Sequence, residues 1–205
     1  MTSALQALLA GLSTGLGLIV AIGAQNAWVI RQGVRREGVG LVVAICIACD
    51  VSLIALGTAG VGALAEAVPW LLAALKWGGV VYLLRFAYLS ARSALTASAS
   101  LESAPSAPAR GTIALTTLGV SLLNPHVYLD TVLMLGTVTS SFGSAKWWAA
   151  TGAMAASTAW FAAIGYGART AAPVLERPRT WRILDGLVAL VMVAVAARLA
   201  FGQSR

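Results

Sequence analysis

The chain has 205 residues, of which 59% are hydrophobic and only 10% are charged, and its mean hydropathy is +0.85. Soluble domains carry about 25% charged residues, and a soluble fold of this length could not hide so much apolar surface. The net charge of +7 would suggest a nucleic-acid partner in a soluble protein. Here the basic residues fall mostly between apolar runs, where they act as topology signals, so we expect a membrane protein with no nucleic-acid partner.

The apolar runs are long and continuous, as membrane-spanning helices require, and they lack the alternation of barrel strands. Six runs qualify as spans. They cover residues 4–30, 39–62, 69–91, 111–138, 147–168 and 181–201. We therefore predict an all-α integral membrane protein with six transmembrane helices.

Two of these spans contain signals that interrupt a helix. Gly23 stands before the amides of Gln25 and Asn26 in the first span, and Asn124 precedes Pro125 in the fourth. Proline removes a backbone donor and disfavours helical geometry in the residue before it. Unwound backbone is tolerated in a membrane only where protein buries it or it lines a cavity. We predict that helices one and four are broken at Gly23 and Pro125, and that the three amide side chains bind substrate.

Three aspartates lie inside spans: Asp50 in the second, Asp130 in the fourth and Asp185 in the sixth. A carboxylate at the bilayer centre costs about 2.5–3.5 kcal/mol even on the lenient insertion scale. A structural explanation would be an ion pair, with Arg85 of the third span or, for Asp185, with Arg182. We predict instead that Asp50 and Asp130 bind substrate and carry protons.

Two further candidates lie between the fourth-span break and Asp130. His126 is the only histidine, and it could relay protons because its pKa is normally near neutrality; a lone histidine is more often structural. Tyr128 is predicted to contact substrate. The sequence has no second histidine or cysteine cluster for a metal, no phosphate-binding glycine loop and no hydrolase motif, so we expect no metal, no cofactor and no enzymatic activity.

The chain reads as a duplicated unit. Residues 1–95 and 111–205 each hold three spans, and a Ser-, Ala- and Pro-rich linker at 96–110 joins them. An odd number of spans gives the two units opposite orientations, and such inverted repeats are a recurrent transporter design with the site at their interface. Basic residues are more numerous after spans one, three and five. These segments should face the cytoplasm, which places both termini outside.

Two segments carry a resemblance to a known family. The sequence GLIVAIGAQNAWVIRQG at residues 17–33 and the sequence LNPHVYLD at residues 123–130 resemble the two signatures of the lysine and arginine exporter (LysE/ArgO) family. The resemblance implies a multi-pass secondary transporter that exports L-lysine or L-arginine across the bacterial cytoplasmic (inner) membrane. Moving one positive charge outward against 100 mV costs about 2.3 kcal/mol, so we expect exchange for protons.

Other interpretations stay open. The substrate could be a neutral amino acid or another small solute of the same superfamily. A cation channel or metal-ion transporter would use the same aspartates, but the spans lack an array of soft metal ligands. A homodimer also stays open, because six short helices leave little room for a substrate path. The expected partners are therefore the substrate, protons and membrane lipid.

Overall fold

A computed structural model describes residues 4–20, 23–60, 109–123 and 127–175 as nearly continuous segments. It also describes scattered positions between residues 77 and 92 and between residues 186 and 200. All elements with defined bounds are helices. They are α1 (Ala4–Ile19), α2 (Ala24–Arg35), α3 (Val39–Ala59), α6 (Arg110–Leu122), the π-helix η1 (Tyr128–Met134), α8 (Leu135–Ser140), the 3-10 helix η2 (Gly143–Ala145) and α9 (Lys146–Leu175).

The first predicted span consists of two helices rather than one. The chain leaves α1 at Ile19 and enters α2 at Ala24, and the two helices are bent by 79°. Gly23 is the N-cap of α2 and has extended backbone. The bend lies where the sequence predicts a break at Gly23, and Gln25 and Asn26 lie in the first turn of α2.

The second predicted span is confirmed as α3. Among the described residues, α3 is the one unbroken helix that is long and apolar enough to cross a membrane, and α1 with α2 qualifies as a bent pair. The third and sixth predicted spans are described only at scattered positions, and most of the 96–110 linker lies outside the described residues. The count of six spans and the division into two repeats therefore stay predictions.

The fourth predicted span is described in two parts. The helix α6 ends at Leu122, and the next element, η1, begins at Tyr128. Asn124, Pro125 and His126, between these two elements, lie outside the described residues. The π-helix runs directly into α8. Single-turn π-helical segments are rare and occur frequently at functional sites.

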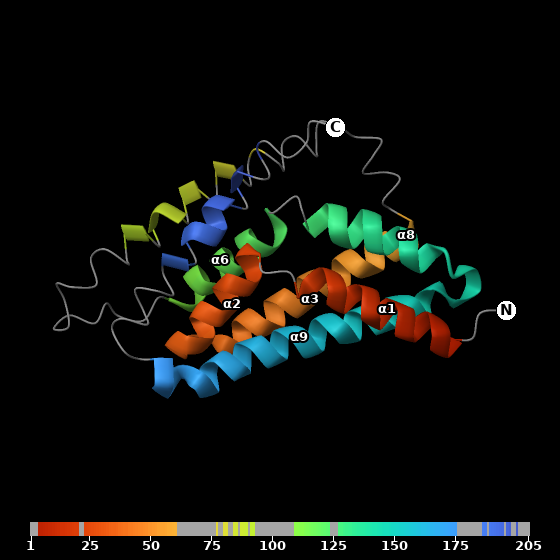
Figure 1. Cartoon of the computed structure of the whole chain (residues 1–205), viewed down its shortest axis with the longest axis horizontal. Helices are drawn as coiled ribbons and strands as arrows, with labels where there is room; N and C mark the ends of the chain where they lie inside the picture. Colours follow the sequence, from red (N-terminus) through yellow and green to blue (C-terminus); the bar gives the residue numbers. More distant parts are fainter. Residues whose placement is uncertain are drawn as a thin grey trace.

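The longest element, α9, runs along the molecule beside α1, α2 and α3 (Figure 1). Small residues allow close contact with α1: a Cβ atom at Gly15 would lie 3.0 Å from the Cα of Ala153, and one at Gly11 would overlap the carbonyl of Ala149. Besides α9, the helix α3 also packs against α6, η1 and α8. Such small-residue contacts are typical of helices that associate in a membrane.

Candidate functional site

Asp50 lies near the middle of α3, and its side chain is only 5% exposed. It belongs to a buried stripe with Cys46, Leu53 and Ile54, at the three- and four-residue spacing that places side chains on one helix face. The hydroxyl of Ser157, on α9, donates a hydrogen bond of 2.7 Å to Oδ2 of Asp50. The carboxylate therefore lies at the contact between α3 and α9.

The first break brings an amide to the same place. The side chain of Gln25 lies close enough to the Asp50 carboxylate and the Cys46 thiol to interact with both. Its Nε2 atom is buried but has no partner within hydrogen-bond geometry. A buried donor left in this state costs about 1–3 kcal/mol, so a bound ligand with an acceptor oxygen would be stabilised here.

The second break also approaches this face of α3. The hydroxyl oxygen of Ser121, at the end of α6, lies 4.0 Å from Sγ of Cys46. Tyr128, at the start of η1, is partly buried, and its side chain is near the thiol of Cys49 on α3. Ser121 precedes and Tyr128 follows the predicted second break at Pro125. The helix face that carries Cys46 and Asp50 therefore lies near the residues that flank both predicted breaks. The residues of this face and its surroundings form what we term the Asp50 cluster: Gln25, Cys46, Asp50, Ser121, Tyr128 and Ser157.

The Asp50 carboxylate has no cationic partner among the described residues, since the groups that contact it are a hydroxyl and an amide. Arg85 is exposed and forms no ion pair with another described residue. Asp185 and Arg182 lie outside the described residues. Within the described part of the chain, no ion pair neutralises Asp50.

Asn26 has contacts of a different kind. Its Nδ2 donates to the carbonyl of Ile19 at 2.8 Å, and the indole Nε1 of Trp160 donates to its Oδ1 at 3.3 Å. The Ile19 carbonyl is at the last turn of α1, where helix carbonyls lack intrahelical partners. Asn26 therefore bridges α1, α2 and α9 across the break, which positions Gln25 beside Asp50.

Asp130 lies in η1 and is partly buried. Its predicted roles in substrate binding and proton transfer stay predictions, as do those of Asn124 and His126. Sequence reasoning missed Ser157 and Ser121, because a hydroxyl within a small-residue helix carries no signal of what it faces. No group of three or more His, Cys, Asp or Glu side chains in the described part of the chain could hold a metal ion.

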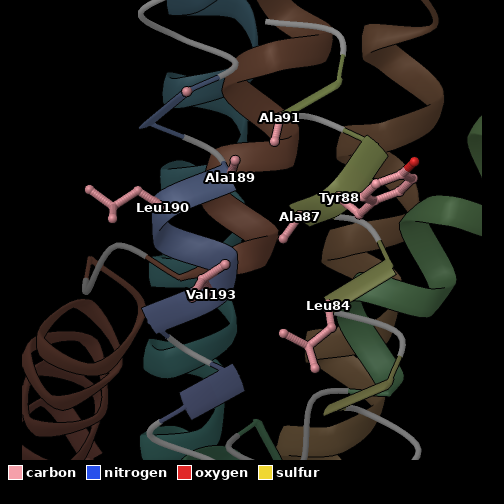
Figure 2. Close-up of a pocket in the computed structure, with 8 residues that line it drawn as sticks. Leu84, Ala87, Tyr88, Ala91, Ala189, Leu190 and Val193 are labelled. Carbon is pink, nitrogen blue, oxygen red and sulfur yellow. The ribbon is translucent and has the colours of Figure 1, made fainter. Parts of the chain in front are cut away.

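A separate apolar groove of about 620 Å³ lies between parts of the third and sixth predicted spans. Its lining side chains come from two segments that face each other (Figure 2): Leu84, Ala87, Tyr88 and Ala91 from one, and Gly186, Ala189, Leu190 and Val193 from the other. Among the described residues that line it, none is charged and none belongs to the Asp50 cluster.

Apolar spans with breaks that meet beside a buried carboxylate are typical of membrane translocators. A family model described as LysE type translocator matches residues 16–203. The chain therefore belongs to the LysE type translocator family, whose members are membrane transporters and not enzymes. This confirms the family predicted from the two signatures.

Relatives are similar over nearly their full lengths. A candidate amino-acid transporter of Mycobacterium tuberculosis is 43% identical over 87% of this chain and 89% of its own. The arginine exporter ArgO of Pectobacterium carotovorum is 40% identical over 94% of this chain and 95% of its own. The lysine exporter LysE of Corynebacterium diphtheriae is 37% identical, with 93% and 97% coverage. No solved structure matches the chain.

Proposed function

We propose that this protein exports a basic amino acid, L-lysine or L-arginine, from the bacterial cytoplasm across the inner membrane in exchange for protons. The names of the two exporters that are 37% and 40% identical to it support the substrate class. The observation that carries the proposal is the Asp50 carboxylate, which is buried in an apolar helix and contacted by neutral polar groups.

Charge balance favours a cationic substrate at this site. A buried carboxylate without a counter-charge is costly, and an ammonium or guanidinium group in contact with it would offset that cost. Ser157 uses one acceptor position of Oδ2, and a carboxylate has about four such positions. A substrate cation would use positions that the neighbouring hydroxyl and amide leave open.

The Nε2 atom of Gln25, which has no partner in hydrogen-bond geometry, suggests how the other end of an amino acid could bind. This buried atom can donate to the carboxylate of a substrate whose cationic group contacts Asp50. Tyr128 and, from the second break, Asn124 are the proposed partners on the opposite side. Asn26 would act indirectly, because its contacts to Ile19 and Trp160 hold the first break.

Proton exchange follows from the single carboxylate. Asp50 can be neutralised by a substrate cation or by a proton, but not by both. If protonation from outside displaces the substrate and the neutral site then returns, each outward cation is exchanged for an inward proton. The exchange would offset the roughly 2.3 kcal/mol needed to move one charge against 100 mV. Asp130 and His126 are further candidates for the proton path.

We also propose that residues 1–95 and 111–205 are inverted repeats, each with three spans. The packing supports this arrangement: α3, from the first unit, packs against α6, η1 and α8, whereas α9, from the second, packs against α1 and α2. In a two-fold arrangement, the second span of each unit packs against the first span of the other unit. Here α3 and α9 are these second spans.

The test is export from proteoliposomes loaded with radiolabelled lysine, arginine, threonine or leucine. We expect lysine or arginine to leave fastest, and an acidic exterior to accelerate export until a protonophore collapses the gradient. Export of threonine or leucine in place of the basic amino acids would make the protein a neutral amino-acid exporter. Rates that do not change when the gradient collapses would contradict proton exchange.

A further inference from the structure

A polar pocket of about 420 Å³ lies at the start of α3 and shares no residue with the Asp50 cluster. Its walls come from the α2–α3 connection, the first turn of α3, the start of α6 and the last part of α9. The lining residues are Arg36, Gly38, Val39, Gly40, Leu41, Arg110 and Arg169.

Three arginines from three separate parts of the chain line this space. Like charges repel one another, so three arginines at one pocket favour an anion between them. Arg110 and Arg169 form no ion pair within the described residues. Glu37, the one carboxylate in the α2–α3 connection, does not line the pocket.

The start of α3 adds backbone donors to the same pocket. Gly38 is the N-cap, with a φ of 59°, and it offers no side chain to cap the helix. The first helical hydrogen bond to it comes from the amide of Val42, at 3.0 Å. The earlier amides of α3, at Val39, Gly40 and Leu41, lack intrahelical partners, and helix N-termini in this state attract anions.

The pocket lies where an apolar span begins, because Val39 is the first residue of α3, which is long and apolar enough to cross a membrane. In a bilayer, the start of such a span would lie near the headgroups. Arginine forks match phosphate oxygens bidentately, and basic pockets between transmembrane helices on the cytoplasmic side bind phosphorylated headgroups.

We propose that Arg36, Arg110, Arg169 and the N-terminus of α3 form a binding site for a phosphate group. The group is carried either by an anionic phospholipid or by free inorganic phosphate. Its binding would tie the α2–α3 connection to α6 and α9, and so stabilise contacts between the two halves of the chain at one membrane face.

The test measures the thermal stability of the purified full-length protein in neutral detergent during three titrations. The additives are phosphatidylglycerol, phosphatidylcholine and inorganic phosphate. We expect phosphatidylglycerol to raise the midpoint by about 5 °C near saturation, with no comparable effect of phosphatidylcholine. Stabilisation by inorganic phosphate alone, at an equal concentration, would identify free phosphate as the source.

The matched variants are Arg110→Gln with Arg169→Gln, which removes two pocket charges, and Arg35→Gln, which removes an exposed neighbouring charge that does not line the pocket. The double variant should lose the stabilisation, and Arg35→Gln should keep it. Native mass spectrometry of the single variant Arg169→Gln gives a second readout, with fewer retained anionic lipids or phosphates expected. Equal stabilisation and equal retention in wild type and pocket variants would overturn the proposal.

Discussion

The hydrogen bond from Ser157 to Asp50 fixes the orientation of a buried carboxylate without neutralising it. An arginine in the same position would have stabilised the charge permanently and prevented exchange. The hydroxyl instead leaves Asp50 available to a cation or a proton. The amide of Gln25 is equally neutral, so the charge of the site depends on what is bound.

We predict that Ser157→Ala weakens substrate binding and leaves protein levels in the membrane unchanged. The variant loses the bond that orients the Asp50 carboxylate, so the half-saturating substrate concentration should rise by up to about tenfold. Ser52→Ala is the matched control, because this exposed hydroxyl on α3 bonds only to the carbonyl of Ala48. Export assayed over a range of internal substrate concentrations would show the difference. Equal values for the two variants would exclude Ser157 from the site.

Asp50 and Gln25 could be predicted from the sequence because a carboxylate and an amide in apolar spans are costly and conspicuous. Ser157 could not, since a serine bonds to its own helix as readily as to a neighbour. Trp160 lies in the middle of the fifth predicted span, and its indole donates a hydrogen bond to Asn26. The sequence showed Asn26 as a ligand candidate, and only the structure shows its bond to the end of α1.

The boundaries of two helices lie close to the residues at which the sequence predicts breaks. The helix α2 starts directly after Gly23, and α6 ends at Leu122, before Pro125. Glycine and proline weaken a helix locally, so such boundaries can be predicted without tertiary information. The π-helix η1 was not predicted, because no residue type specifies the extra backbone residue of a π turn. It follows the second break directly and includes both Tyr128 and Asp130.

We predict that Gly57→Ala destabilises the contact between α3 and η1. A Cβ at Gly57 would lie 2.7 Å from the carbonyl oxygen of Val132, and backbone cannot move aside cheaply. Overpacking of this kind costs about 1–3 kcal/mol. Gly17→Ala is the control, since nothing lies within 4 Å of its added Cβ. Thermal unfolding in detergent should show a lower midpoint for Gly57→Ala alone; a matching change in both would contradict the close approach.

The reciprocal packing of the two halves is the main feature of the whole molecule. Sequence symmetry suggested two units, but it could not show that α9 would lie against the first break and α3 against the second. These helix contacts depend on small residues, such as Gly15 on α1 and Gly57 on α3, whose neighbours are defined only in the folded chain. The described residues that line the apolar groove of Figure 2 come from two segments, one before and one after the 96–110 linker.

We predict opposite accessibility for the two connections that flank the broken spans. A cysteine at Ser144, in η2, should react with a membrane-impermeant maleimide in intact cells, whereas one at Arg35 should react only after permeabilisation. The native Cys46 and Cys49 are buried and should give little background. Labelling of both positions from outside would contradict the inverted topology.

The most direct test of the central claim is proton-driven export of lysine and arginine by Asp50→Asn in proteoliposomes. The amide keeps the shape of the side chain but can hold neither a substrate cation by charge nor an exchangeable proton. Loss of one partner of a buried charge pair typically costs 2–5 kcal/mol, so export should fall by about 100-fold while reconstitution and thermal stability persist. Export at the wild-type rate, with its dependence on the proton gradient intact, would contradict the assignment of Asp50 as the exchange site.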